Sequence, residues 1–173
     1  MENIEENKKI IKNKIQQAHK NSNFSSLPYP KLVAVSKKQE DYKIEHAIKS
    51  GQKIYGENRV QEAQQRWQKI IESYNDIELR LIGPLQTNKV KQALNLFHII
   101  ETIDREKLAK EIFNNFNNQS KTKNFYIQIN TGSENQKSGL IPSEADAFIE
   151  YCKKDLKLPI NGLMCIPPQD EEP

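Results

Sequence analysis

Residues 31–36 read Lys-Leu-Val-Ala-Val-Ser, a short run rich in β-branched side chains that predicts a strand buried on both faces. Residues 40–50 follow with apolar side chains at helical spacing, and Gly51 comes directly after them, where glycine often ends a helix. Lys53-Ile-Tyr-Gly56 then predicts a second strand. A strand, a helix and a strand in this order predict two parallel strands joined by a helical crossover.

The same alternation continues on both sides of this unit. Before it, residues 4–18 carry apolar side chains at helical spacing, and Pro28 and Pro30 follow the end of that helix. After it, we expect helices at about residues 57–74, 86–94, 104–118 and 143–154, and strands at residues 78–83, 96–101, 124–130 and 160–166. Ser143 and Asp146 form a capping-box pattern at the start of the last helix.

Six strands alternating with helices fit two architectures, an open doubly wound sheet or a (β/α)₈ barrel of the TIM type. No Gly-x-Gly-x-x-Gly pattern follows the first strand, which counts against an open sheet that binds dinucleotides. We therefore favour the α/β class with a TIM-type barrel, as a single domain over residues 1–173. A complete barrel needs eight units and at least about 200 residues. We expect an incomplete barrel of six units, short by about two.

Composition excludes several functional classes. The chain is 36% apolar and 28% charged, as in globular proteins, and its net charge of +3 includes no arginine cluster, so we expect no nucleic-acid partner. Its apolar runs are far too short to span a membrane, and its acidic start resembles no secretory signal, so we expect a cytoplasmic protein.

Cys152 and Cys165 stand in no metal-ligand spacing, so we expect no metal site. We expect Cys165 to lie in the core. His98, inside an apolar strand, is expected to be a satisfied core histidine.

Small polar residues, glycines and lysines follow the predicted strands, at the barrel edge where functional residues lie. This chemistry suits an anionic ligand that carries a carbonyl group. Lys37 directly follows the first strand, so we expect apolar side chains to wall its stem and favour the neutral amine, the form that attacks an aldehyde to give a Schiff base. Position alone does not distinguish Lys37 from Lys38, because most of the 22 lysines are expected to be solvated surface charges.

Six motifs occur in order across nearly the whole chain. They are Lys31-Leu-Val-Ala-Val-Ser-Lys37, Tyr55-Gly-Glu-Asn-Arg-Val-Gln-Glu62, Leu81-Ile-Gly-Pro-Leu-Gln-Thr-Asn-Lys89, Ile127-Gln-Ile-Asn130, Gln136-Lys-Ser-Gly139 and Gly162-Leu-Met-Cys-Ile-Pro167. Together they resemble the pyridoxal 5′-phosphate (PLP) homeostasis protein family, whose fold is similar to the barrel domain of alanine racemase. The resemblance implies a PLP-binding protein of vitamin B6 homeostasis that is not an enzyme and performs no turnover.

The resemblance also assigns residues and partners. It implies that Lys37 carries PLP as a Schiff base, and that Asn58, Asn130 and Met164 lie near the cofactor ring. Structural roles stay open for Asn58 as a loop residue and for Met164 as core filler. The implied partners are PLP itself and apoenzymes that accept it, and we expect a monomer.

The sequence also departs from this family. Its members continue beyond the Gly162-Leu-Met164 strand with segments that hold the PLP phosphate, and this sequence contains neither of them. We therefore expect a C-terminally truncated chain with weakened phosphate binding and with open edges at its first and sixth strands. Two alternatives stay open. The chain is a non-functional remnant of the family, or, less favoured, a PLP-dependent amino-acid racemase, which needs a second acid–base group and a further domain.

Overall fold

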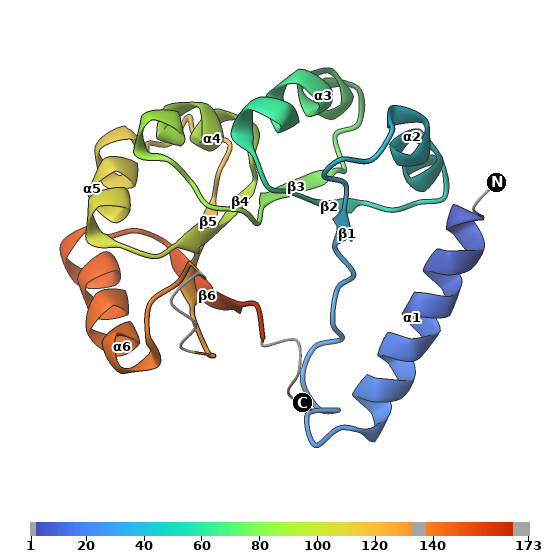
Figure 1. Ribbon diagram of the computed structural model, residues 1–173, viewed down its shortest axis with the longest axis horizontal. Coiled ribbons are helices and arrows are strands. Elements are labelled where there is room, and N and C mark those ends of the chain that lie inside the picture. Colours follow the sequence, from blue (N-terminus) through green and yellow to red (C-terminus); the bar gives the residue numbers. More distant parts are fainter. Residues whose placement is uncertain (1–2, 133–137, 168–173) are drawn as a thin grey trace. The chain divides into compact units, whose positions relative to one another are not determined.

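The computed structural model describes residues 3–132 and 138–167. Helices and strands alternate along the chain, as the sequence predicts (Figure 1). The chain divides into two compact units, residues 1–56 and residues 57–173. The prediction that residues 1–173 form a single domain stays a prediction. Within the described ranges, no helix combines the length and the apolar composition that crossing a membrane requires.

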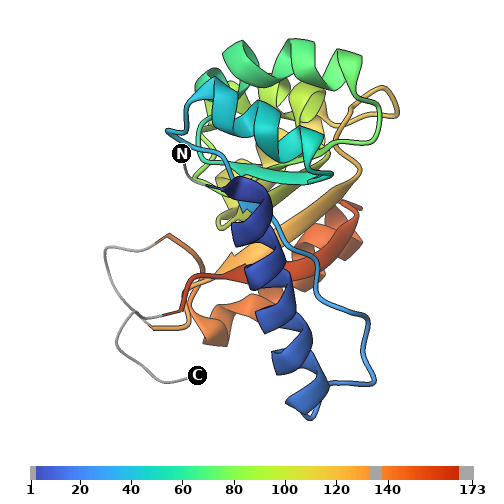
Figure 2. The ribbon, with the colours of Figure 1, turned by 90° about the vertical axis from the view of Figure 1, so that its right-hand side faces the viewer.

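The first unit contains α1 (Ile4–Asn21), β1 (Ala34–Val35), α2 (Asp41–Lys49) and most of β2 (Ile54–Glu57). Figure 2 shows α1 along its length and the extended segment that leads from it towards β1. β1 and β2 pair in parallel, with Ala34 beside Tyr55 and Val35 beside Gly56. β1 has only two residues and Val35 is 47% exposed, so the prediction of a first strand buried on both faces is wrong.

The second unit repeats the strand–helix pattern. Its elements are α3 (Val60–Ser73), β3 (Glu78–Leu81), the 3₁₀ turn η1 (Thr87–Lys89), α4 (Val90–Leu96), β4 (Ile99–Ile103), α5 (Glu106–Asn115), β5 (Asn124–Ile129), α6 (Pro142–Glu150), the π-helical turn η2 (Tyr151–Asp155) and β6 (Ile160–Cys165). Strands β3, β4, β5 and β6 lie in sequence order and pair in parallel. Helices α3 to α6 follow one side of this strand layer (Figure 1).

The two faces of these strands differ in chemistry. Leu79, Leu81 and Ile127 are fully buried among the apolar residues of the core. Arg80 alternates with the two leucines along β3, so it lies on the opposite face. There Arg80 Nη1 donates to Glu101 Oε1 of β4 at 3.0 Å. Helices α3 to α6 cover one side of these strands, as in a barrel (Figure 1), whereas an open doubly wound sheet carries helices on both faces.

Several predicted boundaries are wrong for local reasons. Glu57 was expected in a helix but ends β2, and α3 begins at Val60. Leu96 ends α4, whereas β4 begins at Ile99. The capping box is also wrong, because Ile141 is the N-cap residue of α6 and makes no side-chain cap bond.

The two cysteines differ from each other in burial. Cys152 is buried and Cys165 is exposed, so the expected core position of Cys165 is wrong. Burial, followed by the charge of Glu106, raises the pKa of the Cys152 thiol to about 12. Among the described residues, no three His, Cys, Asp or Glu side chains gather as metal ligands.

Candidate functional site

A tight turn at the end of β1 presents Lys37. Ser36 is only 4% exposed, and its N–H donates to the Gly56 carbonyl at 3.0 Å. The Gln39 N–H donates to the Ser36 carbonyl at 3.1 Å, so Lys37 and Lys38 are the central residues of the turn. Lys38 has a φ of +58°, a left-handed conformation that costs a residue with a side chain about 1–2 kcal/mol. Such strain persists only where neighbouring contacts hold it, and here they fix the backbone on both sides of Lys37.

The Lys37 side chain itself is exposed. This contradicts the expectation that apolar side chains would wall its stem. Lys37 and Lys38 are both exposed, so burial does not distinguish them. They differ in their backbone: Lys37 directly follows the buried Ser36, whereas Lys38 has the strained positive φ.

In the second unit, the segment after β2 is fixed against the end of β3. A Cβ atom on Gly83 would lie 2.3 Å from the carbonyl oxygen of Asn58, so only glycine fits at this close approach. The Ile82 N–H donates to the Glu57 carbonyl at 2.9 Å, and Thr102 Oγ1 donates to the Gly83 carbonyl at 2.8 Å. These contacts join the carboxyl ends of β2, β3 and β4, and the close approach of Asn58 explains why residue 83 is glycine.

Asn58 lies at this edge with a half-buried side chain. Across residues 3–132 and 138–167, no hydrogen bond involves its side-chain amide, which leaves both a donor and an acceptor for a ligand. A purely structural loop role, the alternative left open by the sequence, would be expected to employ that amide in a turn or cap.

Glu57 also holds the segment after β2 in place, and the sequence analysis did not predict this role. Its side chain is fully buried, and its Oε1 accepts from Trp67 Nε1 at 3.0 Å and from Arg66 Nη1 at 3.3 Å. A buried carboxylate needs such partners because removing its charge from water is costly. The one available signal was an acidic residue directly after a strand, which is also a common first-turn helix residue.

Asn130 follows β5 and is held by the segment that contains Gly139. The Asn130 N–H donates to the Leu140 carbonyl at 2.8 Å, and the Leu140 N–H donates to the Gln128 carbonyl at 2.9 Å. Gly139 has a φ of +121°, and a Cβ atom there would lie 2.8 Å from the Asn130 nitrogen. Gln128 Nε2 donates to the Ser138 carbonyl at 3.1 Å. Residues 133–137, which include the start of the Gln136-Lys-Ser-Gly139 motif, lie outside the described residues.

Met164 lies on the neighbouring strand. In the parallel register of β5 and β6, Gln128 is beside Met164 and Ile129 is beside Cys165. Met164 is half-buried, whereas Leu163 on the other face of β6 is 59% exposed. The structure therefore brings Asn130 and Met164 to the carboxyl ends of two adjacent strands, with Gln128 next to both.

Deeper in the second unit, the charge of Arg80 is neutralised. Its Nε donates to Glu78 Oε1 at 2.6 Å, in addition to the bond to Glu101. Burial acts to lower the Arg80 pKa, but the hydrogen bonds and charges of the two glutamates outweigh it and raise the pKa. Arg80 therefore stays protonated, and its guanidinium is bound by the carboxylates of Glu78 and Glu101. For that reason we do not assign it to a ligand phosphate.

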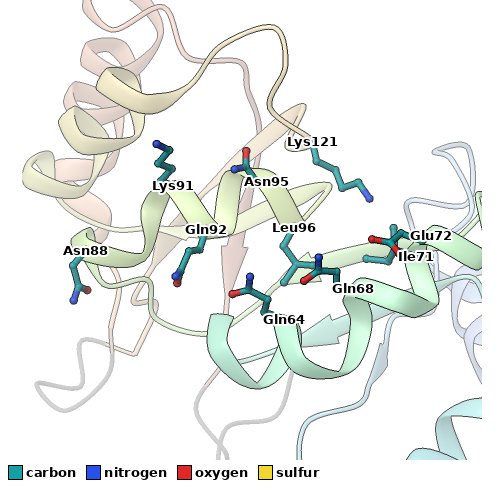
Figure 3. Close-up of a pocket in the computed structure, with 10 residues that line it drawn as sticks. All are labelled: Gln64, Gln68, Ile71, Glu72, Asn88, Lys91, Gln92, Asn95, Leu96 and Lys121. Carbon is teal, nitrogen blue, oxygen red and sulfur yellow. The ribbon is translucent and has the colours of Figure 1, made fainter.

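A surface cavity of about 600 Å³ lies elsewhere, between α3 and α4 (Figure 3). It is lined mostly by amide and charged side chains of the helices, together with parts of neighbouring loops: Gln64, Gln68, Ile71, Glu72, Asn88, Lys91, Gln92, Asn95, Leu96 and Lys121. None of these residues lies on a strand or directly follows one of the carboxyl ends described above. We therefore do not assign this cavity as the functional site, because barrels carry their sites at the strand ends.

The layering of the second unit (Figure 1) and its polar strand ends are those of a barrel domain, and the family match places this barrel in the alanine racemase class. The family model described as the alanine racemase N-terminal domain matches residues 3–173. The PLP homeostasis protein of Haemophilus influenzae is 34% identical over 165 residues, which cover 95% of this chain and 69% of the relative. That of Pasteurella multocida is 36% identical over 172 residues, which cover 97% of this chain and 72% of the relative.

A solved structure agrees with these relatives. The structure of PipY from Synechococcus elongatus PCC7942 with PLP bound has a TM-score of 0.69 and 25% identity, over 93% of this chain and 72% of that chain. The chain belongs to the pyridoxal phosphate homeostasis protein family. The family resemblance and the barrel fold inferred from the sequence are thereby confirmed.

Proposed function

We propose that this chain binds PLP through a Schiff base on Lys37 and serves PLP (vitamin B6) homeostasis by binding rather than by turnover. The observation that carries the proposal is the likeness to PipY, whose structure with PLP bound matches 93% of this chain. The names of the curated relatives support the same role, because they describe PLP homeostasis and no reaction. A racemase activity is the weaker alternative for that reason.

The residues at the strand ends fit this cofactor. PLP supplies an aldehyde that reacts reversibly with a primary amine, together with a heteroaromatic ring and a phosphate. Lys37 supplies the amine from a turn whose backbone is fixed by Ser36. Asn58 and Asn130 supply amide groups for the polar atoms of the ring, and the Met164 thioether suits contact with an aromatic face.

The finer parts of the proposal concern location and partners. We place the protein in the cytoplasm as a monomer that passes PLP to apoenzymes. Exposure of the Lys37 side chain supports transfer, since a recipient can reach an exposed amine more easily than a buried one. Single-domain behaviour of residues 1–173 belongs to the same proposal.

The test is a PLP titration of the purified chain, followed by borohydride reduction and mass spectrometry of the labelled peptide. We expect saturable visible absorption and one label, on Lys37. Lys37→Ala should remove both the absorption and the label. Lys38→Ala is the matched control, because it removes the neighbouring amine of the same turn, and it should retain both. Unsaturable labelling of many lysines, unchanged by Lys37→Ala, would refute the proposal.

A further inference from the structure

Gln128 holds a buried acceptor that the protein does not use. The residue is only 5% exposed and alternates along β5 with Ile127 and Ile129, which face the core. Its Nε2 donates to the Ser138 carbonyl at 3.1 Å. Its Oε1 is buried, and no donor among the described residues reaches it. Leaving a buried acceptor unsatisfied costs about 1–3 kcal/mol, so such an atom in a folded protein needs an explanation.

The hydrogen bond from Nε2 to the Ser138 carbonyl fixes the orientation of the Gln128 amide, so that Oε1 is the atom left for another group. An amide has one acceptor oxygen and one donor nitrogen, and turning it over would set Oε1 against the Ser138 carbonyl, which also has only lone pairs. Gln128 therefore offers an acceptor and keeps its donor in place. A group that completes this site must bring an N–H or an O–H.

The neighbours of Gln128 are residues of the proposed PLP site. Met164 is its register partner on β6, and Asn130 lies two residues further along the same face of β5. On the other side along this face, the ring of Tyr126 lies against Gly162, where a Cβ atom would come within 3.2 Å of it. Tyr126 and Gly162 thus occupy the space next to Gln128 towards the start of the strands. A ligand of the proposed site would meet Gln128 from the carboxyl ends, where the buried Asn130 lies.

We propose that Gln128 Oε1 accepts a hydrogen bond from an N–H or O–H of the bound pyridine cofactor and so selects its protonated form. The inference rests on the proposed function and deepens it. Gln128 is then a specificity-determining contact in addition to the four residues that the sequence assigned. A structural role limited to holding Ser138 and Gly139 is the alternative that the test must separate.

The test compares two variants by PLP affinity and by a pH titration of the visible band of bound PLP. Gln128→Met keeps the length of the side chain but removes the acceptor. We expect affinity to fall about tenfold, the size of effect that loss of one such bond gives, and the apparent pKa of the band to fall. Gln128→Glu supplies a charged acceptor, which favours the protonated donor, and should raise that pKa. Opposite shifts in the two variants are the expected result.

The outcomes separate this inference from the proposed function. If wild-type chain binds PLP on Lys37 but neither variant shifts the band pKa, Gln128 does not contact the ligand and the inference fails alone. Weaker binding of Gln128→Met without a pKa shift in either variant assigns it a structural role and also overturns the inference. If wild-type chain does not bind PLP at Lys37, both fail. Trp67 fluorescence checks folding, and if Gln128→Met does not fold, the direction of the shift in Gln128→Glu decides.

Discussion

At the level of single residues, His98 links the stability of the second unit to pH. Its backbone N–H donates to the Leu79 carbonyl at 2.8 Å, and its ring Nδ1 accepts from the Leu79 N–H at 3.0 Å. The ring is half-buried, so the expected core position is wrong, whereas the expected hydrogen bonding is seen at Nδ1. Burial, followed by the charge of Lys121, lowers the His98 pKa. An unfolded histidine has a pKa of about 6.5. As pH falls through this value, the unfolded chain takes up a proton that the folded chain resists, so stability conferred by His98 is present above about pH 6.5 and is lost below it.

We expect His98→Asn to reduce this pH dependence, because the amide oxygen can accept from Leu79 without titrating. The measurement is the midpoint of urea unfolding, followed by Trp67 fluorescence, between pH 5 and pH 8. The exposed His46 is the matched control, and His46→Asn should leave the wild-type slope unchanged. Equal slopes for wild type and His98→Asn would show that other groups set the acid sensitivity.

At the level of elements, the close approach of Asn58 to Gly83 sets how the ends of β2 and β3 meet. Gly83→Ala places a Cβ atom 2.3 Å from backbone, which cannot move aside as a flexible side chain can. We expect it to lower the free energy of unfolding by at least about 2 kcal/mol, the cost of overpacking a tight site. Urea unfolding of the variant measures this loss.

Gly51→Ala is the control for glycine replacement as such. Gly51 has a φ of +79°, but a Cβ atom there meets nothing within 4 Å. Its replacement should therefore cost only the left-handed conformation, about 1 kcal/mol. If Gly83→Ala destabilises the chain no more than Gly51→Ala does, the contact with Asn58 does not constrain the fold.

The type and order of the elements could be predicted because apolar periodicity is a local property of the sequence. Their ends depend on partners that are distant in sequence. Glu57 looks like a first-turn helix residue until the indole of Trp67 and the guanidinium of Arg66 are seen to bind its carboxylate. Ser143 and Asp146 have the spacing of a capping box, yet Pro142 occupies the first turn and Ile141 the cap. Three-residue spacing alone does not fix where a helix begins.

At the level of the whole molecule, the sequence could propose site residues only where a family motif contained them. Lys37, Asn58, Asn130 and Met164 follow from the family resemblance, and no pattern of charge or spacing would select them. The proposed role of Gln128 could not be predicted from the sequence, because it rests on the hydrogen bond that Nε2 makes to Ser138 and on the lack of a donor, among the described residues, for the buried Oε1. A polar residue at a face that alternates with Ile127 and Ile129 was the one available signal, and it gives no information about which amide atom is used.

Burial also differs along the chain, and local stability should follow it. Every residue of β4 is buried, and β4 pairs with a strand on each side, so its amides should open only with the whole second unit. α1 has no buried residue, and its Ile10 and Ile11 are each 45% exposed. Within its unit, α1 is tied to the residue after α2 by Lys8, which donates to Ser50 Oγ at 3.0 Å.

We therefore expect α1 to exchange its amide hydrogens faster than the other helices, and β4 to exchange its amide hydrogens more slowly than the other strands. Hydrogen exchange followed by mass spectrometry measures both rates. Lys8→Ala should speed exchange in α1 further and leave β4 unchanged, because Ser50, to which Lys8 donates, lies in the first unit. Protection of α1 equal to that of β4 would contradict the view that burial within each unit sets the order of opening. Slower exchange at residues 128–130 on addition of PLP would connect this local stability to the proposed site, since a ligand that binds only the folded state suppresses opening where it binds.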